Sequence, residues 1–359
     1  MPKAGALWAV VLAGGSGTRF WPESRARNAK QFLPIFGSKT LLEQTVDRLS
    51  PLVPRSRVLV ITHERDTARV SKLLRIPRTQ VIGEPVGRNT APCAALAADW
   101  VARRDPDGVI ALLPADHLIV KTALFRRALA AASAVASRSG LPVTFGIKPA
   151  FAHTGYGYLE TGTVYARERG FAIRKLKRFR EKPALAQAKA FVRAGRFLWN
   201  SGMFVWRAAD LLKETRRHLP AAARLIDRMH AGNWNKNFKR LYPAMPGISI
   251  DYGLMEKMRG RILTLPVDIG WYDLGSWLAM PDLWPRDAQN NSVLGEPLLV
   301  ESRGNIVRSG RRMVALLGVE NLVVVDTEDA LLVCAKDQTE SVRKIVNRLA
   351  DKKGWRKYL

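Results

Sequence analysis

Four short, uninterrupted apolar segments in the first third of this chain most constrain what it can fold into. They span residues 6–13, 57–62, 80–83 and 109–113. Each has the length of a strand that is buried on both faces, as the strands of parallel sheets are. Helical patterns lie between them, at residues 40–49 and 90–100. Strands that alternate with helices predict a doubly wound, mostly parallel α/β sheet of the Rossmann-like kind, with a ligand crevice at the carboxyl ends of the strands.

Local capping signals support both helices. The sequence Thr40-Leu-Leu-Glu43 has the spacing of a capping box, in which each side chain bonds to the backbone N–H of the other residue. Thr90 begins an alanine-rich stretch, and we expect its hydroxyl oxygen to cap that helix. Because the crevice of such a sheet lies where strands end, functional residues should cluster in the loops that follow the strands.

The second half of the chain has a looser pattern. From about residue 155, hairpin-like β segments at 156–159 and 164–165 alternate with helices near 184–194 and 208–217, and we interpret this region as an insertion that forms a second wall over the crevice. After a Pro- and Asp-containing stretch, short strands recur at 298–301, 305–307, 313–316, 322–325 and 331–334, followed by a helix at 339–349. We therefore predict a catalytic domain of residues 1–285 and a small β-strand-rich domain of residues 286–359. Glycine turns at 304, 310 and 318 suggest a β-solenoid with too few rungs to define a repeat.

Composition excludes several classes of protein. With 359 residues, 47% of them hydrophobic, the chain is long enough for about two globular domains and is neither disordered nor fibrous. Cys93 and Cys334 are far apart and lack metal-ligand spacing, so we expect no disulfide framework, no zinc site and a reducing, cytoplasmic location. Lys3 and the apolar residues after it imitate a signal peptide, but the segment continues into a glycine-rich loop and is interpreted as a buried first strand. No other segment is long enough to span a membrane.

The chain is strongly basic. Its 58 Lys and Arg residues against 31 Asp and Glu residues give a formal net charge of +27. Clustered cations would suit nucleic acid, anionic lipid or phosphate-rich substrates. Most of the excess is scattered along the chain, and no RNA-binding signature or zinc-finger spacing accompanies it, so we interpret it as a solvated surface. Charge alone therefore assigns no function.

A glycine-rich loop follows the first apolar segment, at Leu12-Ala-Gly-Gly-Ser-Gly-Thr-Arg-Phe-Trp-Pro22. Three glycines within four positions let backbone N–H groups close around an oxyanion without obstruction by Cβ atoms. The loop is not a P-loop, and Phe20 replaces the third glycine of the dinucleotide fingerprint. Arg19 and Lys30 add two cations that could neutralise a triphosphate and its departing pyrophosphate. The motif predicts a phosphate-binding loop, with a purely structural turn as the alternative.

Several separated segments carry a resemblance to a known family. They are residues 12–34, 83–90 (Gly-Glu-Pro-Val-Gly-Arg-Asn-Thr), 114–117 (Pro-Ala-Asp-His), 155–160, 181–183 (Glu-Lys-Pro), 200–204, 248–252 and 271–277 (Trp-Tyr-Asp-Leu-Gly-Ser-Trp). In order and spacing they resemble the sugar-nucleotide pyrophosphorylases, specifically the mannose-1-phosphate guanylyltransferase (GDP-mannose pyrophosphorylase) family. The resemblance implies a GT-A-type nucleotidyltransferase fold with a short β-helical tail. It also implies an enzyme that transfers GMP from GTP to mannose 1-phosphate.

The resemblance assigns roles to particular positions. Arg19, Lys30 and Lys182 would be catalytic, and Asp116 and Asp273 would hold Mg²⁺, an ion that prefers hard oxygen ligands. The implied nucleotide-binding residues are Leu12, Ala13, Gly14, Gly15, Gly17, Thr18, Arg88, Asn89, Thr90 and Asp116. The implied sugar-binding residues are Gly157, Glu181, Asn200 and Asp251. Alternatives remain for individual residues: Asp116 alone could be a turn or cap residue, Thr90 could merely cap its helix, and Arg88 could be surface charge.

The candidate residues, which are cations and carboxylates, suit the transfer of a nucleotidyl group to a sugar phosphate. A phosphate oxygen of a sugar 1-phosphate is already an anionic nucleophile, and pyrophosphate is a tolerable leaving group, so no serine or cysteine nucleophile is required. The resemblance implies in-line attack on the α-phosphorus of GTP, with Mg²⁺ between Asp116 and Asp273. Arg19 and Lys30 would hold the β- and γ-phosphates, and Lys182 the sugar phosphate. Tyr156, Trp206 and Trp271 are interpreted as core packing and His117 as a packing or hydrogen-bonding neighbour.

Two departures from the family pattern leave every charged group in place. Ala29 stands where a proline is usual, and Ala115 where a serine is common. Many bacterial members continue into a phosphomannose isomerase domain, and because this chain ends at Leu359 we expect no isomerase activity. The expected partners are GTP and mannose 1-phosphate, with neither nucleic acid nor membrane, and the β-rich tail could form a homodimer contact.

Two alternative functions stay open at this point. A sister guanylyltransferase would act on another sugar 1-phosphate, such as a manno-heptose 1-phosphate. A basic nucleic-acid-binding protein on the same scaffold would use the C-terminal cations Lys352, Lys353, Arg356 and Lys357.

Overall fold

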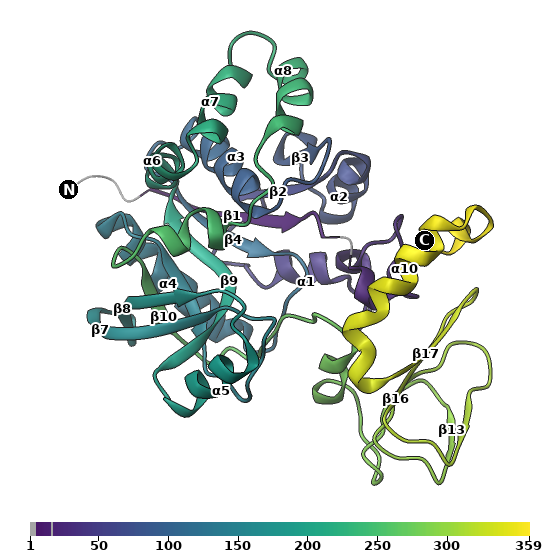
Figure 1. Ribbon diagram of the computed structural model, residues 1–359. Coiled ribbons are helices and arrows are strands. Elements are labelled where there is room, and N and C mark those ends of the chain that lie inside the picture. Colours follow the sequence, from purple (N-terminus) through teal and green to yellow (C-terminus); the bar gives the residue numbers. More distant parts are fainter. Residues whose placement is uncertain (1–4, 16) are drawn as a thin grey trace. The chain divides into compact units, whose positions relative to one another are not determined.

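The computed structural model describes residues 5–15 and 17–359, so Lys3 of the signal-like segment lies outside the described residues. The chain forms two compact units (Figure 1). Unit 1 contains the residues up to Gly14, Thr45–Ala115 and Ile119–Trp271, and unit 2 contains the residues from Gly15 to Gln44, Asp116–Leu118 and Tyr272–Leu359. Within the described part of the chain, no helix is long and apolar enough to cross a membrane.

A nine-stranded sheet organises unit 1, in the order β3-β2-β1-β4-β9-β6-β10-β8-β7. Its strands are β1 (Leu7–Ala13), β2 (Val58–His63), β3 (Val81–Glu84), β4 (Val109–Pro114), β6 (Val143–Ile147), β7 (Tyr158–Glu168), β8 (Phe171–Arg180), β9 (Phe197–Arg207) and β10 (Leu263–Pro266). The four apolar segments of the first third pair in parallel, with Val10 aligned to Leu59 on one side and to Leu112 on the other. The doubly wound α/β prediction is therefore confirmed for this half of the sheet.

The other half of the sheet is mixed rather than parallel. Strand β9 runs antiparallel between β4 and β6, and β8 runs antiparallel to both β10 and β7. The hairpin segments expected to form a separate wall instead extend the same sheet. This happens because β9 is buried along most of its length and pairs on both edges, which leaves no sheet edge between the two halves.

The helices of unit 1 gather around the sheet, and Figure 1 shows α6, α7 and α8 grouped around α3. They are α2 (Thr67–Leu74), α3 (Thr90–Ala102), α4 (Thr122–Ser139), α5 (Leu185–Arg193), α6 (Ala208–His218), α7 (Pro220–Met229), α8 (Trp234–Leu241) and α9 (Ile250–Gly253). Buried alanines of α3 lie in one apolar core with Trp206 and Tyr242, which are fully buried. Core packing is thus confirmed for Trp206. The short strands β5 (Leu118–Ile119) and β11 (Trp271–Tyr272) lie where the chain passes between the units.

One of the two capping predictions is confirmed and the other is wrong. Helix α1 (Leu41–Asp47) starts with the predicted box: Thr40 N–H donates to Glu43 Oε2 (2.9 Å) and Glu43 N–H donates to Thr40 Oγ1 (3.2 Å). For α3, the cap is Asn89 and not Thr90, because Asn89 Oδ1 accepts from the Thr90 N–H (2.8 Å). The Thr90 hydroxyl instead accepts from the Ile250 N–H (2.9 Å).

Unit 2 contains the β-helix-like tail that the sequence predicts. Its strands are β12 (Ser292–Leu294), β13 (Leu298–Val300), β14 (Ile306–Arg308), β15 (Ala315–Leu317), β16 (Leu322–Asp326) and β17 (Leu331–Ala335). Strands β12, β14 and β16 pair in parallel, as do β13 and β15. Buried Asn305 joins successive rungs, because its N–H donates to Asn291 Oδ1 (2.9 Å) and its own Oδ1 accepts from the Leu322 N–H (2.8 Å). The tail continues into α10 (Arg343–Asp351).

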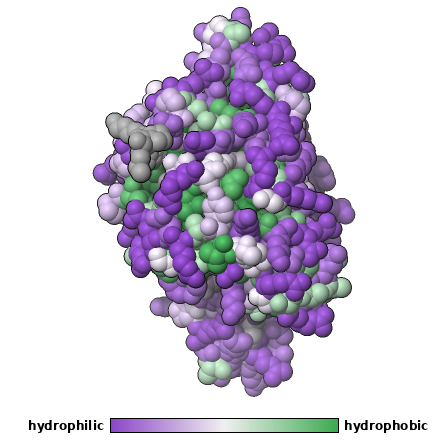
Figure 2. All heavy atoms as spheres, turned by 90° about the vertical axis from the view of Figure 1, so that its left-hand side faces the viewer, coloured by the Kyte–Doolittle hydropathy of each residue, from purple (hydrophilic) through white to green (hydrophobic). Residues whose placement is uncertain are grey.

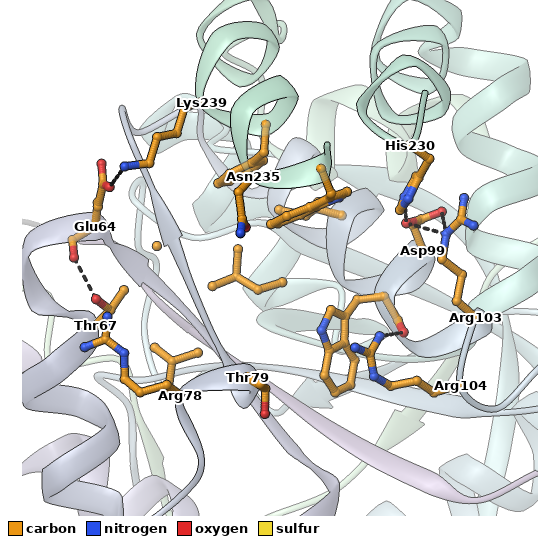
Figure 3. A pocket seen from close by; sticks show the side chains of 17 residues that line it. Glu64, Thr67, Arg78, Thr79, Asp99, Arg103, Arg104, His230, Asn235 and Lys239 are labelled. Carbon is orange, nitrogen blue, oxygen red and sulfur yellow. Dashed lines mark hydrogen bonds and ion pairs between the residues drawn. The ribbon is translucent and has the colours of Figure 1, made fainter. Parts of the chain in front are cut away.

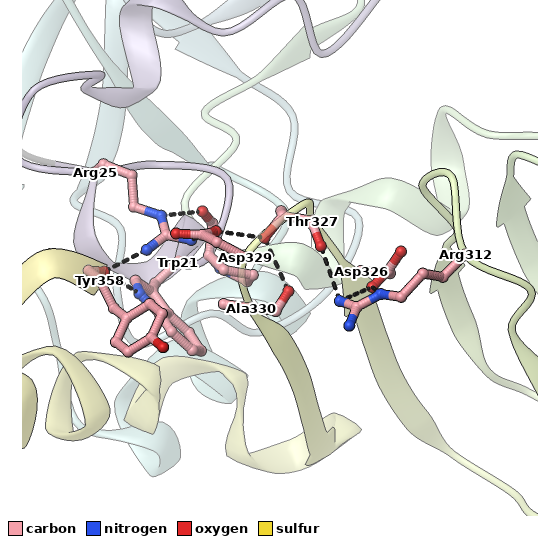
Figure 4. Close-up of polar contacts among 9 residues, drawn as sticks. Trp21, Arg25, Arg312, Asp326, Thr327, Asp329, Ala330 and Tyr358 are labelled. Carbon is pink, nitrogen blue, oxygen red and sulfur yellow. Dashed lines mark hydrogen bonds and ion pairs between the residues drawn. The ribbon is translucent and has the colours of Figure 1, made fainter. Parts of the chain in front are cut away.

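The loop after β1 belongs to the same core as this tail. Phe20 lies 4.9 Å from Trp277 between ring centroids, and both pack in one buried cluster with Ile306 and Val323. Trp21 Nε1 donates to the backbone oxygen of Tyr358 (2.8 Å), and Arg25 pairs with Asp329 at 2.6 Å (Figure 4). Packing therefore divides the chain differently from the sequence boundary at residues 285–286, which stays a prediction.

Polar side chains cover much of the face of the molecule that Figure 2 presents. Figure 2 shows hydrophilic residues spread over the face in view, with apolar residues in smaller groups between them. This face agrees with the interpretation of the scattered charge as a solvated surface.

Candidate functional site

Lys30 is the centre of a charged cluster in unit 2, which we call the Lys30 cluster (Lys30, Asp116 and Asp273). Only 4% of Lys30 is exposed, and its Nζ lies 2.8 Å from Asp116 Oδ2 and 3.1 Å from the main-chain oxygen of Asp273. A buried ammonium is costly unless it is paired, and these contacts pair it. Burial alone would raise the pKa of Asp116, but the charge of Lys30 and its hydrogen bond outweigh burial and lower that pKa.

The segment around Asp273 is held rigidly. Asp273 Oδ1 accepts from the Gly275 N–H (3.0 Å), and the buried Leu274 between them has a φ of 49°. That left-handed conformation is strained for a branched side chain, and such strain concentrates at functional sites. The fold brings Asp116 and Asp273 to the same lysine although 157 positions separate them in numbering.

Hard carboxylate oxygens make the Lys30 cluster a suitable donor set for a divalent cation such as Mg²⁺. Asp116 places a carboxylate oxygen 2.8 Å from Lys30 Nζ. Asp273 contacts the same ammonium through its main-chain oxygen, and its carboxylate Oδ1 accepts from the Gly275 N–H. Among the described residues, there is no group of three or more His, Cys, Asp and Glu side chains that could hold a metal by itself. A metal at Asp116 and Asp273 would therefore take further ligands from a substrate or from water.

The glycine-rich loop reaches the same cluster through Gly17. Gly17 has a φ of 64°, and a Cβ added there would lie 2.4 Å from Lys30 Cβ, so only glycine fits. Gly15 is exposed, with open space around it, while Leu12 and Ala13 are the last residues of β1. Thr18 begins a 3₁₀ turn, Thr18–Phe20.

Arg19 has a partner that sequence reasoning missed. Its Nε lies 3.0 Å from Glu340 Oε2, and its Nη1 donates to the backbone oxygen of Gly275 (3.4 Å). The side chain is still 42% exposed. In unit 2, Arg19 is thus oriented by a carboxylate of the tail and remains accessible to solvent.

The segment Arg88-Asn89-Thr90 starts α3 in unit 1. Asn89 has φ 66° and ψ −172°, a backbone region that is almost exclusive to glycine. Asn89 is exposed, and its carboxamide nitrogen has no partner among the described residues. Arg88 Nη2 donates to the backbone oxygen of Pro243, while its buried Nε makes no hydrogen bond within the described part of the chain. The strained backbone therefore presents an amide donor at the start of a helix.

A buried group that sequence reasoning missed lies behind this segment. Glu84, 3% exposed, ends β3 and accepts from Tyr242 Oη (2.6 Å) and from Cys93 Sγ (3.2 Å). Burial and the charge of Glu84 raise the pKa of Cys93 well above its usual value, so Cys93 is a thiol. A Cβ added at Gly14 would lie 3.1 Å from Glu84 Oε2, which places the carboxylate beside the loop. Its position directly after an apolar strand was the signal that could have identified it.

The predicted sugar residues come together in unit 1, and we call them the Glu181 cluster (Gly157, Glu181, Lys182, Asn200 and Asp251). Lys182 Nζ lies 3.0 Å from Glu181 Oε1, and Asn200 Nδ2 donates to Asp251 Oδ1 (2.9 Å). The Asn200 N–H donates to the Gly157 oxygen (2.8 Å), and a Cβ at Gly157 would lie 2.4 Å from Glu181 Oε2. Glycine is thus required for this approach.

The Glu181 cluster has one acceptor without a donor. Glu181 Oε2 is buried, and no hydrogen-bond partner for it exists among the described residues. A buried carboxylate oxygen without a donor is costly, and such exceptions call for a ligand or a functional explanation. Lys182, with a φ of 43°, lies in the left-handed region. The geometry therefore offers a carboxylate acceptor and an ammonium donor side by side.

The two carboxyl groups of the cluster influence each other. Burial first, and then the charge of Glu181, raise the pKa of Asp251 to about 7. Burial would lower the pKa of Lys182, but the hydrogen bond and charge of Glu181 outweigh it and raise that pKa. At neutral pH Lys182 is therefore cationic, and Asp251 holds its proton to a higher pH than an exposed aspartate does.

Aromatic residues lie next to members of this cluster in the sequence, because Tyr156 precedes Gly157 and Trp199 precedes Asn200. Tyr156 stacks on His153 at 4.0 Å between centroids and meets Trp199 and Trp271 edge-on at 5.1 and 5.4 Å. Trp271 is buried, in agreement with its interpretation as packing, whereas Tyr156 is only partly buried. Sequence reasoning missed His153 and Trp199, because their pairing with Tyr156 depends on the sheet.

The chain is similar to known proteins over nearly its whole length. Residues 8–290 match the family described as Nucleotidyl transferase, and residues 295–349 match the MannoseP isomerase/GMP-like beta-helix domain. Xanthan biosynthesis protein XanB of Xanthomonas campestris is 38% identical over 347 residues, which are 95% of this chain and 72% of that protein. Mannose-1-phosphate guanylyltransferase of Escherichia coli (strain K12) is 36% identical over 352 residues, which are 96% of this chain and 73% of that protein.

A solved structure gives the same result for the fold. A crystal structure of mannose-1-phosphate geranyltransferase from Thermus thermophilus superposes with a TM-score of 0.86 at 36% sequence identity. The superposition covers 96% of this chain and 99% of that chain. The sheet and the β-helix-like tail are therefore both shared with known proteins.

Proposed function

We propose a reaction for this chain on the basis of its family, because the chain belongs to the nucleotidyl transferase family. Relatives named mannose-1-phosphate guanylyltransferase align with nearly its whole length, at 35–37% identity. The reaction is the transfer of GMP from GTP to mannose 1-phosphate, which gives GDP-mannose and pyrophosphate.

The unpaired oxygen of Glu181 is the observation that best supports a phosphorylated sugar as acceptor. A hexose hydroxyl would donate to Glu181 Oε2, which lacks a donor among the described residues. Lys182, 3.0 Å from the same carboxylate, would bind the phosphate, and Asn200 and Asp251 would bind further hydroxyls. Gly157, which has no Cβ, allows Glu181 Oε2 to lie close to its backbone.

The nucleotide would be bound by the loop residues and by the start of α3. Backbone N–H groups of Gly14, Gly15 and Gly17, with Leu12, Ala13 and Thr18, would surround phosphate oxygens. The carboxamide nitrogen of Asn89 would donate to an acceptor on the guanine edge, next to Arg88 and Thr90. A base edge read by hydrogen bonds can discriminate against analogues by as much as ~10⁴.

Catalysis would come from cationic groups that neutralise the negative charge of the phosphates. A phosphate oxygen of mannose 1-phosphate attacks the α-phosphorus in line, the bond to the β-phosphate oxygen breaks, and pyrophosphate leaves with that electron pair. Lys30 and Arg19 offset the charge that accumulates on the pyrophosphate, and Lys182 orients the attacking phosphate. Asp116 and Asp273 would hold Mg²⁺, which when bound contributes positive charge at the phosphoryl oxygens.

Pyrophosphate release tests the proposal. Purified protein with Mg²⁺ is given GTP, ATP, UTP or dTTP, each combined with mannose, glucose or manno-heptose 1-phosphate. We expect strong release only for GTP with mannose 1-phosphate. Release only with heptose 1-phosphate would retain the mechanism and replace the sugar, whereas no release with any pair would contradict the proposal.

A further inference from the structure

Unit 1 contains a pocket that none of the residues assigned above lines. Its volume is about 700 Å³, within the range of ~300–1,000 Å³ that is usual for small-molecule sites. We call it the α8 pocket; it is formed by β3, the later turns of α3, the end of α7, and α8 (Figure 3). Asp99, which lines it, follows Thr90 by nine residues on α3, and nine residues of helix span about 14 Å. A ligand there and a nucleotide at Asn89 could therefore be bound at the same time.

Three of the residues that line this pocket, Trp100, Trp234 and Phe238, have large aromatic rings. Trp234 and Phe238, one turn apart on α8, stack with centroids 4.7 Å apart and planes 6° from parallel. On the α3 side, the Arg104 guanidinium lies 3.7 Å above the ring of Trp100. Flat aromatic surfaces favour a ligand with a flat ring, because stacked and offset-stacked rings attract each other.

The charged side chains of the pocket favour an anion. Four cations line it, Arg78, Arg103, Arg104 and Lys239, against two carboxylates, Glu64 and Asp99. Both carboxylates are already neutralised, because Glu64 pairs with Lys239 at 2.5 Å and Asp99 pairs with Arg103 at 3.1 Å and with His230 at 2.6 Å. The side chain of Arg78 makes no hydrogen bond or ion pair with any described residue. The pocket therefore has more cationic than anionic side chains beside its aromatic rings.

Asn235 supplies an amide that can form hydrogen bonds with the edge of a heterocyclic ring. Its amide points into the pocket from α8 (Figure 3), and within the described part of the chain it has no hydrogen-bond partner. An amide offers a donor and an acceptor together, which is the pattern that binds the edge of a purine.

We propose that the α8 pocket is a second binding site, for a purine nucleotide. The ring lies against Trp234, Asn235 bonds to its edge, and Arg78 binds its phosphate. This site is independent of the reaction proposed above.

Photolabelling of the full chain with 8-azido-GTP, followed by peptide mapping, tests this site. We expect two labelled peptides, one of which contains Trp234. The double variant Arg78→Ala/Asn235→Ala changes only exposed side chains, and it should reduce labelling of the α8 peptide roughly tenfold or more while the other labelled peptide is unchanged. The matched control Arg224→Ala removes an exposed cation of α7 that does not line the pocket, and it should leave both labels intact.

Competition identifies the chemistry of the ligand. GMP should displace the α8 label, whereas UMP and pyrophosphate should displace it at least tenfold less well. Absence of label on α8, label that survives the double variant, or displacement by pyrophosphate as effective as by GMP would each overturn the proposal. A chain that forms no GDP-mannose but still shows GMP-displaceable label on α8 would contradict the proposed reaction and leave this site standing.

Discussion

Three residues assigned to the reaction or next to it have backbone conformations that favour glycine. Asn89, Lys182 and Leu274 have φ angles of 66°, 43° and 49°. Each such residue costs on the order of 1–3 kcal/mol, so the surrounding structure must hold it in place. In each case the strain fixes a polar group: the Asn89 amide, the Lys182 ammonium, or the Asp273 carboxylate that precedes Leu274. Rigid placement of charge is what a reaction that depends on positioning requires.

Replacement of Lys182 tests the proposed binding of the sugar phosphate. We expect Lys182→Ala to lower kcat/KM by on the order of 10²–10³, because the variant loses a cation that orients and neutralises the attacking phosphate. Steady-state assays at saturating Mg²⁺ measure the change. Lys189→Ala, an exposed lysine of α5, is the matched control and should change kcat/KM less than twofold. Near-normal turnover of Lys182→Ala would remove this residue from the mechanism.

The raised pKa of Asp251 predicts how stability depends on pH. Because burial and Glu181 raise this pKa from 3.8 to about 7, the folded state holds a proton that the unfolded state releases. The contribution to stability is therefore full below about pH 4 and is lost as the pH rises through about 7.

The variant Asp251→Asn removes that titration. Urea unfolding at pH 5 and pH 8 should show a smaller loss of unfolding free energy for the variant than for the native chain, with the exposed Glu296→Gln as control. An equal loss in the native chain and in Asp251→Asn would show that another group titrates.

At the scale of elements, features that depend on neighbouring residues could be predicted from the sequence, whereas features that depend on tertiary contacts could not. The capping box of α1 lies within four residues, so the sequence was sufficient to predict it. The cap of α3 was predicted one residue late, because the unusual φ of Asn89 frees its side chain to cap and leaves Thr90 to bond to Ile250, which lies 160 positions away. Insertion of β9 antiparallel into the sheet depends on pairing between distant segments, which no local pattern encodes.

Two variants separate the backbone role of Asn89 from its side-chain role. Asn89→Gly fits the backbone and should cost only a few tenths of a kcal/mol in unfolding free energy, whereas Asn89→Ala adds strain and should cost roughly 1–3 kcal/mol. Both variants lose the amide, so both should raise KM for GTP. Thermal unfolding and GTP titration measure the two effects. If Asn89→Gly kept the native KM, the amide would have no part in base recognition.

At the scale of the whole molecule, the loop after β1 folds with the C-terminal tail. Phe20 and Trp21 pack with Trp277, Ile306 and Val323, so residues near both ends of the chain share one core. Sequence patterns identified the strands of each region but not this long-range packing, since apolar residues do not encode their partners. The same holds for Glu84 and Tyr242, which meet although 158 positions separate them. Each motif could be located in the sequence because its residues lie within a few positions of one another, and the roles assigned to those residues stay predictions.

The asparagine rungs should be essential to this second core. Asn305→Ala removes the side-chain hydrogen bonds to Asn291, Val319 and Leu322 in a buried position and should lower the unfolding free energy by about 2–3 kcal/mol. Denaturant unfolding measures the change, with the exposed Gln289→Ala as control. A loss below about 0.5 kcal/mol would mean that the strands, and not the asparagine, hold the rungs together.

The central claim is that a phosphate oxygen of mannose 1-phosphate attacks the α-phosphorus of GTP. Mannose 1-phosphate labelled with ¹⁸O at its three non-bridging phosphate oxygens tests this directly, with the products analysed by mass spectrometry. We expect all three labelled oxygens to appear in GDP-mannose and none in pyrophosphate. Label in pyrophosphate, or no GDP-mannose from GTP and mannose 1-phosphate, would contradict it.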